Sequence, residues 1–135
     1  MKPIIIFLTV LLISLLSSPS WSETLDDLVE RDGLFYKKFT NTPFTGEVSG
    51  IESGDFKNGT RIGEWLFFHK NGQLHWVGKY KDGKEDGLWK SYHKNGQLWT
   101  KGKYKNGKRH GRWEWYYDNG QLKDEKYYNN GKFLK

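Results

Sequence analysis

The chain has 135 residues and a formal net charge of +6, with seven Trp, eight Tyr, eight Phe and sixteen Gly. A chain of this length and composition has room for one domain rich in aromatic residues and turns, and we expect no large enclosed core. It contains no cysteine, which excludes a disulfide framework and a lipid anchor on a cysteine thiol.

Residues 1–22 are typical of a signal peptide. Lys2 precedes the apolar run Ile4–Leu16, and small residues follow, which places the cleavage site between Ser22 and Glu23. The run is shorter than the ~20 residues that a membrane span requires. We therefore expect cleavage after Ser22, no transmembrane span in the mature chain, and a periplasmic or secreted protein.

Residues 23–59 are predicted to form a capping segment. Leu28–Arg31 and Leu34–Lys37 flank an Asp-Gly pair and are typical of a hairpin. Further on, Asp55–Gly59 resembles Lys79–Gly83, 24 residues later, and indicates a shortened repeat. Terminal repeats often deviate in this way because they cover the open end of a stack.

The rest of the chain, residues 60–135, is predicted to be a repeat domain. The segments 63–86, 87–110 and 111–134 align without a gap at a period of 24 residues. The positions that recur, and that we expect to be structural, are Trp65, Trp89 and Trp113; Gly72, Gly96 and Gly120; Leu74, Leu98 and Leu122; and Tyr80, Tyr104 and Tyr128.

Each repeat is predicted to be one antiparallel hairpin. Asn71-Gly72 lies between two strand-like stretches and favours a two-residue type I′ turn, and Asp82-Gly83 breaks the chain again. A helix is excluded by the frequent glycines, each of which costs ~1 kcal/mol relative to alanine. The fold class is therefore all-β, with tandem hairpins forming one elongated, twisted sheet.

A two-residue turn at Asn71-Gly72 places Lys70 opposite Gln73. One face, taken as buried, then holds Trp65, Phe67, His69, Leu74, Trp76, Gly78 and Tyr80. Trp65 lies opposite Gly78 and Trp89 opposite Gly102, so that an indole covers a bare backbone position. A three-residue turn with a bulged glycine is the alternative, and it would swap the faces of one strand.

The other face is expected to be basic and partly aromatic. It is the candidate binding surface, and its residues are Lys79, Tyr92, Trp99, Lys101 and Lys103. Aromatic rings beside lysines suit stacking and cation–π contacts. The alternative is a solvated face on which lysines protect the strands from aggregation.

Charge is distributed unevenly along the chain. Residues 23–59 contain four Lys/Arg and eight Asp/Glu, a net charge of −4, whereas residues 60–135 contain seventeen and eight, a net charge of +9. Such a repeat domain would attract anionic lipid head groups, lipopolysaccharide or acidic glycans. Nucleic acid is not expected as a partner of an exported protein.

No catalytic, cofactor-binding or metal-binding residues are predicted. His69 and His93 share one column of the repeat, but Tyr117 takes that column in the third unit. Neither a Gly-x-Ser-x-Gly nor a His-Glu-x-x-His motif occurs. Asp124 and Glu125 are neighbours in the sequence and should point to opposite faces of a strand. We therefore predict a non-enzymatic protein without a cofactor.

The pattern Gly-x-Trp-x-x-(Tyr/Phe)-x-x-Asn-Gly-Gln-Leu, with Asn-Gly-Lys-Arg-His-Gly at 106–111, resembles the bacterial variant of MORN repeats found in YwqK-type antitoxin-like proteins. The segments Glu30–Tyr36 and Pro43–Gly46 are similar to the N-terminal part of those proteins, so the resemblance covers most of residues 28–132. It implies scaffolding or membrane-proximal binding, and the antitoxin label implies that a partner toxin is bound and blocked.

These observations favour an exported binding or scaffolding module for a protein or an anionic envelope surface. An immunity-type inhibitor of one toxin is the alternative. Carbohydrate binding is a further alternative, because Trp76, Trp99 and Trp115 occupy columns that vary between units. The oligomeric state and the identity of the ligand are left open by the sequence.

Overall fold

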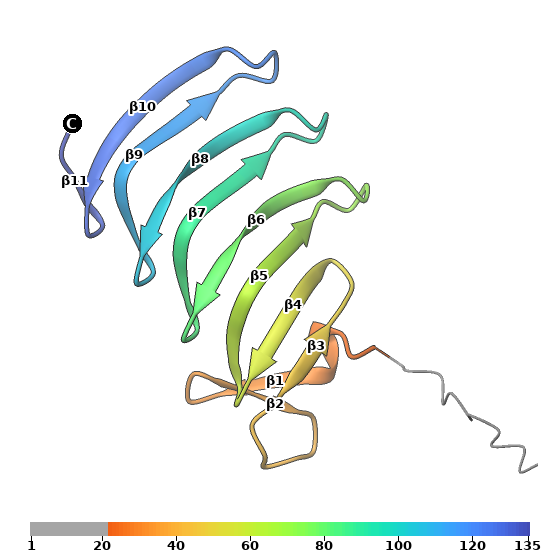
Figure 1. Cartoon of the computed structure of the whole chain (residues 1–135). Helices are drawn as coiled ribbons and strands as arrows, with labels where there is room; N and C mark the ends of the chain where they lie inside the picture. The colour runs from red at the N-terminus through yellow and green to blue at the C-terminus, as the bar shows by residue number, and fades with distance from the viewer. Residues whose placement is uncertain (1–21) are drawn as a thin grey trace, which may run out of the picture.

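The computed structural model describes residues 22–135, which form antiparallel strands with one short 3₁₀ helix (Figure 1). The predicted signal peptide, apart from Ser22, lies outside the described residues. Within the described part of the chain, no helix combines the length and the apolar character needed to cross a bilayer.

The main sheet has nine strands, each paired with the next one along the chain (Figure 1). The strands are β3 (Gly46–Val48), β4 (Glu52–Lys57), β5 (Thr60–Phe68), β6 (Leu74–Lys81), β7 (Lys84–Tyr92), β8 (Leu98–Lys105), β9 (Lys108–Tyr116), β10 (Leu122–Asn129) and β11 (Lys132–Phe133). The predicted all-β class, with tandem antiparallel hairpins in an elongated sheet, is confirmed.

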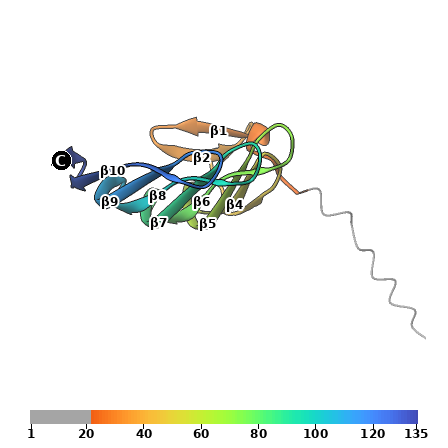
Figure 2. The same cartoon turned by 90° about the horizontal axis from the view of Figure 1, so that it is seen from above.

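The N-terminal segment packs on one face of this sheet (Figure 2). It comprises a 3₁₀ helix, η1 (Leu25–Asp27), and a separate two-stranded sheet of β1 (Leu28–Arg31) and β2 (Leu34–Lys37). The enclosed core lies beneath it, built around the buried side chains of Leu28, Val48, Phe56 and Trp65, with Phe35 and Phe44 packed against them. The enclosed core is therefore small and lies at the β3 end of the sheet.

Two kinds of turn alternate along the main sheet. The turns between units are of the two-residue type, with positive φ at both central residues, as at Asp82 (51°) and Gly83 (77°). Within a unit, at Asn71-Gly72, only the glycine has positive φ, at 84°. The two-residue turn predicted at Asn71-Gly72 is therefore wrong.

A three-residue loop with a bulged glycine closes the hairpin instead. The His69 amide donates a hydrogen bond to the Gln73 carbonyl at 2.7 Å, and the Gly72 amide donates to the His69 carbonyl at 2.9 Å. The Asn71 side-chain oxygen accepts a hydrogen bond from the Gln73 amide at 3.0 Å. This local bond stabilises Asn71 in a conformation without positive φ.

The predicted register of Trp65 opposite Gly78 is nevertheless found, because a β-bulge offsets the longer turn. Phe67 pairs with Trp76, but Phe68 pairs with Leu74, so His75 is an extra residue in its strand. The second and third units have the same irregularity, with Trp99 and Lys123 as the extra residues.

The bulge corrects the predicted faces. Leu74 and Leu98, which were expected on the face of the buried indoles, pair with Phe68 and Tyr92 and lie on the opposite face. A shift of one residue in pairing moves a side chain from one face to the other, so only the residues between the turn and the bulge are affected.

Each buried indole covers a glycine of the preceding strand, not the glycine directly opposite in its own hairpin. A Cβ atom on Gly78 would lie 2.1 Å from the Trp89 ring, and one on Gly102 would lie 2.1 Å from Trp113. The Trp113 Nε1–H also donates a hydrogen bond to the Lys103 carbonyl at 3.1 Å. In the last unit Lys126 takes the place of the glycine.

A file of aromatic rings continues this packing from strand to strand. Successive ring centroids are 5.0–5.9 Å apart and meet edge to face in the order Phe56, Trp65, Tyr80, Trp89, Tyr104 and Trp113. Trp113 is fully buried although β1 and β2 lie at the other end of the sheet. Neighbouring rings of adjacent hairpins thus bury the indoles beyond the enclosed core.

Candidate functional site

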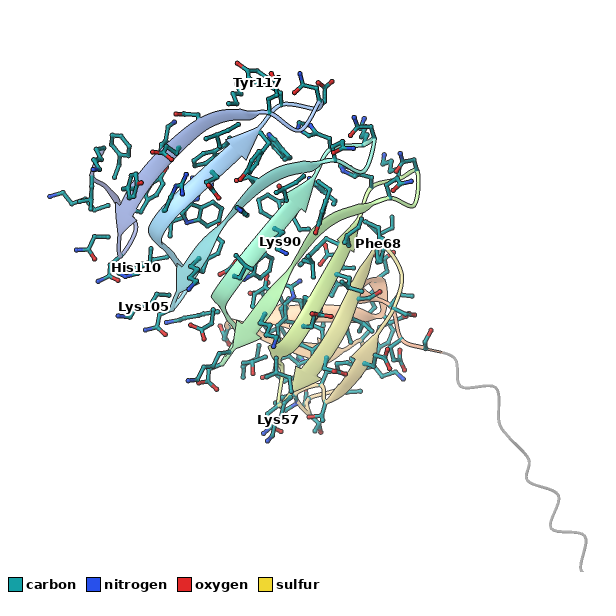
Figure 3. The ribbon with its side chains drawn as sticks, turned by 45° about the horizontal axis from the view of Figure 1, so that its top comes forward. Lys57, Phe68, Lys90, Lys105, His110 and Tyr117 are labelled. Atoms are coloured by element: carbon teal, nitrogen blue, oxygen red, sulfur yellow. The ribbon has the colours of Figure 1, made fainter. Side chains whose placement is uncertain are left out.

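A hollow of about 740 Å³ lies on the face opposite the indoles, and we call it the lysine hollow. Strands β7, β8 and β9 line it, through Leu88, Lys90, Tyr92, Leu98, Lys101, Lys103, His110, Arg112 and Glu114. Figure 3 shows Lys90 over the middle strands, between Phe68 and Tyr117 near one set of loops and Lys105 and His110 near the other. Strand alternation brings the lining side chains of β7 and β9, and Lys101 and Lys103 of β8, to one face, and the bulge at Trp99 adds Leu98.

Like charges face each other across this hollow. Lys90 and Lys101 are directly opposite on β7 and β8, an arrangement that destabilises a sheet unless a counter-charge is present. Glu114 on β9 supplies one, with ion pairs of 3.1 Å to Lys101 and 2.9 Å to Arg112. Within residues 22–135, Lys90 and Lys103 form no ion pair.

The protonation states agree with this pairing. Hydrogen bonding to Glu114 raises the pKa of Lys101. Burial alone would raise the pKa of Glu114, but the hydrogen bond and charge of Lys101 and the charge of Arg112 lower it. Both groups therefore stay ionised at neutral pH, and one carboxylate is shared by two cations.

Apolar groups lie among the charges. Leu88 is 49% exposed and pairs with Lys103 across the strands. Tyr92 and Leu98 pair with each other beside Lys101 and are half-buried. The hollow thus offers ammonium groups next to apolar surface, which suits a ligand that carries a negative charge beside an apolar group.

Four of the five predicted surface residues lie together. Tyr92, Lys101 and Lys103 line the lysine hollow, and Lys79 lines an adjoining hollow of about 350 Å³ that also includes Tyr92. Whether these residues bind a ligand stays a prediction.

Trp99 does not belong with them, and its predicted place beside Lys101 is wrong. Its ring is parallel to that of His75, 6.5 Å away, and lies 6.4 Å from Trp76, which in turn contacts the buried Trp89. The physical reason is the bulge at Trp99, which directs its side chain to the indole face.

Sequence reasoning did not identify Lys90, Arg112 and Glu114 as site residues. The signal for Lys90 was available, because the predicted register already places it opposite Lys101. Arg112 and Glu114 required knowledge of how one hairpin pairs with the next. That pairing contains an irregularity between Lys101 and Lys103, at Gly102. A strand glycine marks a bulge there without fixing which residues pair.

The histidines connect neighbouring hairpin tips. The His69 Nε2–H donates to the Tyr92 carbonyl at 3.1 Å, and His93 makes the same bond to the Tyr116 carbonyl at 3.0 Å. The His69 ring stacks on His75 at 4.0 Å. In residues 22–135 no third His, Cys, Asp or Glu joins such a pair to form a metal-binding group.

Comparison with known families agrees with this architecture. The segments 61–82, 85–106 and 109–132 match the family described as MORN repeat variant. These matches have the 24-residue spacing found in the sequence and begin two residues before each predicted unit. No curated protein and no solved structure matches the chain significantly.

Proposed function

Because this chain belongs to the MORN repeat variant family, whose repeats are generally non-catalytic binding modules, we propose that it is an exported protein that binds an anionic envelope surface. The ligand is the head group of an anionic lipid or of lipopolysaccharide. The N-terminal sequence supports export, since residues 1–22 are typical of a cleaved signal peptide.

The observation that carries the proposal is the pair of lysines, Lys90 and Lys101, that face each other on an exposed sheet surface. Glu114 pairs with both Lys101 and Arg112, and Glu125 pairs with Arg112 as well, whereas Lys90 and Lys103 lack an ion pair within the described residues. An anionic group between Lys90 and Lys101 would relieve the repulsion between their ammonium groups.

The apolar side chains favour an amphiphilic ligand over a simple anion. Leu88 is exposed beside Lys103, so that a phosphate between the lysines would leave its attached apolar chain against leucine. Acidic glycans would balance the charge of the lysines, but they carry no apolar chain to contact Leu88. Among these ligands, an anionic lipid surface is therefore the one that best complements the lysine hollow.

Binding to vesicles tests the proposal. The double variant Lys90→Gln/Lys103→Gln should bind phosphatidylglycerol-containing vesicles roughly thirty-fold more weakly, since each lysine near an anionic surface contributes ~1 kcal/mol. A matched control is Lys57→Gln/Lys105→Gln, which removes the same charge near the turns (Figure 3) and should bind within about twofold of the parent protein. Raising the salt concentration should weaken vesicle binding by the parent protein more than vesicle binding by the double variant.

Lipopolysaccharide and an acidic glycan serve as parallel ligands in the same assay. Equal binding of the double variant and the parent protein to vesicles and lipopolysaccharide, or binding of the parent to neither, would contradict the proposal. A specific protein partner, such as a toxin blocked by this chain, would then be the better interpretation.

A further inference from the structure

One position of the repeat changes sign between units. Arg61, Glu85 and Arg109 each stand four residues before the buried tryptophan of their unit, on β5, β7 and β9. The three positions are structurally equivalent, because the strands repeat at the same period. The middle unit therefore has a carboxylate where its neighbours have a guanidinium.

The two arginines cover aromatic rings of the indole face. The guanidinium carbon of Arg61 lies 4.7 Å from the centroid of Trp65 and 5.6 Å from that of Tyr80. Arg109 lies 4.6 Å from the centroid of Trp113 in the same manner. Cations within ~6 Å of a ring centroid are attracted by the electron-rich face of the ring. In the first and third units the chain thus supplies its own cation.

The middle unit leaves the equivalent place open. A hollow of about 220 Å³ lies there, lined by Phe67, Trp76, Glu85, Trp89 and Tyr104. No Lys or Arg of residues 22–135 forms an ion pair with Glu85. Burial and, second, the negative charge of Glu85 raise the pKa of the adjacent Tyr80 to about 12.

We propose that this aromatic hollow binds a guanidinium group from outside the chain, the side chain of an arginine on a partner protein. Four rings would contact the cation, and the Glu85 carboxylate would balance its charge. The precedent is within the molecule, since Arg61 and Arg109 occupy the same place beside their tryptophans. The aromatic hollow lies on the opposite face from the lysine hollow, so it is independent of the anionic surface proposed above.

A capped arginine, N-acetyl-arginine amide, is a suitable probe, and the neutral N-acetyl-citrulline amide is its isosteric control. The arginine probe should shift the indole N–H resonances of Trp76 and Trp89 saturably. The citrulline probe should bind at least tenfold more weakly, because it has the same shape without the charge. Equal binding of the two probes, or no binding of the arginine probe by the parent protein, would overturn the proposal.

Two substitutions at one position sharpen the test. Glu85→Gln should weaken binding of the arginine probe by about tenfold, the size of one charge-assisted contact. Glu85→Arg should abolish it, because the introduced guanidinium would cover Trp89 as Arg61 covers Trp65, and the melting temperature should not fall. The matched control is Glu64→Gln, because Glu64 lies beside Lys79 on the face of the lysine hollow, and this variant should bind the arginine probe as the parent does.

The two proposals fail separately. Glu85→Arg should leave vesicle binding intact, and Lys90→Gln/Lys103→Gln should leave binding of the arginine probe intact. A folded Glu85→Arg variant that binds the arginine probe as well as the parent protein does would place the cation elsewhere and overturn the assignment of this hollow.

Discussion

The indole of Trp89 lies over the bare backbone of Gly78 in the preceding hairpin, and its Nε1–H donates a hydrogen bond to the adjacent Lys79 carbonyl at 3.2 Å. The same contact joins Trp65 to Gly54 and Trp113 to Gly102. Each hairpin therefore provides the surface on which the next one packs, and stability depends on contacts between neighbouring units.

Replacing Gly78 with alanine should destabilise the protein by ~3 kcal/mol, because a Cβ atom there would overlap the Trp89 ring and force the hairpins apart. Lys126→Ala is the matched control, since Lys126 holds the equivalent position but no tryptophan of a following unit packs on its backbone, and its effect should stay below ~1 kcal/mol. Urea denaturation measures both. Similar losses for the two variants would contradict the packing described for Gly78.

Trp89→Ala should cost ~3–5 kcal/mol in unfolding free energy. Trp89 is 4% exposed and contacts rings on both sides, including Tyr80 and Tyr104. Trp99→Ala removes a side chain of the same size that is 39% exposed and should cost less, ~2 kcal/mol. A loss below ~1 kcal/mol for Trp89→Ala would show that its ring is not part of the packed file.

Stability should fall as the pH drops below neutrality. Burial and, second, the charge of His69 lower the pKa of His75, so the folded protein binds this proton less readily than the unfolded chain, whose His pKa is ~6.5. The contribution of His75 is thus fully present above that value and is lost as the pH falls below it. His75→Trp, which copies the residue of the second unit, should show a shallower loss between pH 7.5 and pH 5.5 by urea denaturation; equal slopes would contradict the assignment.

The exported protein should begin at Glu23, because the apolar run is short and small residues precede the cleavage site. Glu23 forms an isolated bridge with Val48 and an ion pair with Lys37, so cleavage before Glu23 would preserve its contacts with the fold. Mass spectrometry of the protein recovered from the periplasm or the medium gives the N-terminus. An intact chain in the membrane fraction would contradict this prediction.

The sequence predicts the architecture because the same few residues recur at a constant period. Asn-Gly or Asp-Gly pairs mark the turns within and between the units, and the stretches between these pairs form the strands. It could not distinguish the turn at Asn71-Gly72 from that at Asp82-Gly83, since both dipeptides suit either turn. The bulge at His75 restores the register beyond the longer turn, and no residue type in the sequence identifies its position.

The candidate sites were predictable to different extents. Alternation along a regular strand correctly places Lys101 and Lys103 on one face, but it fails for Trp99 because the bulge intervenes. The exchange of arginine for Glu85 is visible in the sequence. The hollow beside Glu85 could not be predicted, because its aromatic rings come from four strands and are brought together only by pairing between hairpins.

The bulge residues are positions at which the surface chemistry of such a protein can be changed by substitution. His75, Trp99 and Lys123 differ in size, charge and aromaticity, yet the ladder of hydrogen-bonded pairs around them is the same. A bulged residue has no cross-strand partner that its side chain must match. Each unit therefore carries one interchangeable position near its tip, and consecutive units set these positions in a row. Substitutions in that row could therefore introduce chosen side chains without altering the strand pairing of the sheet.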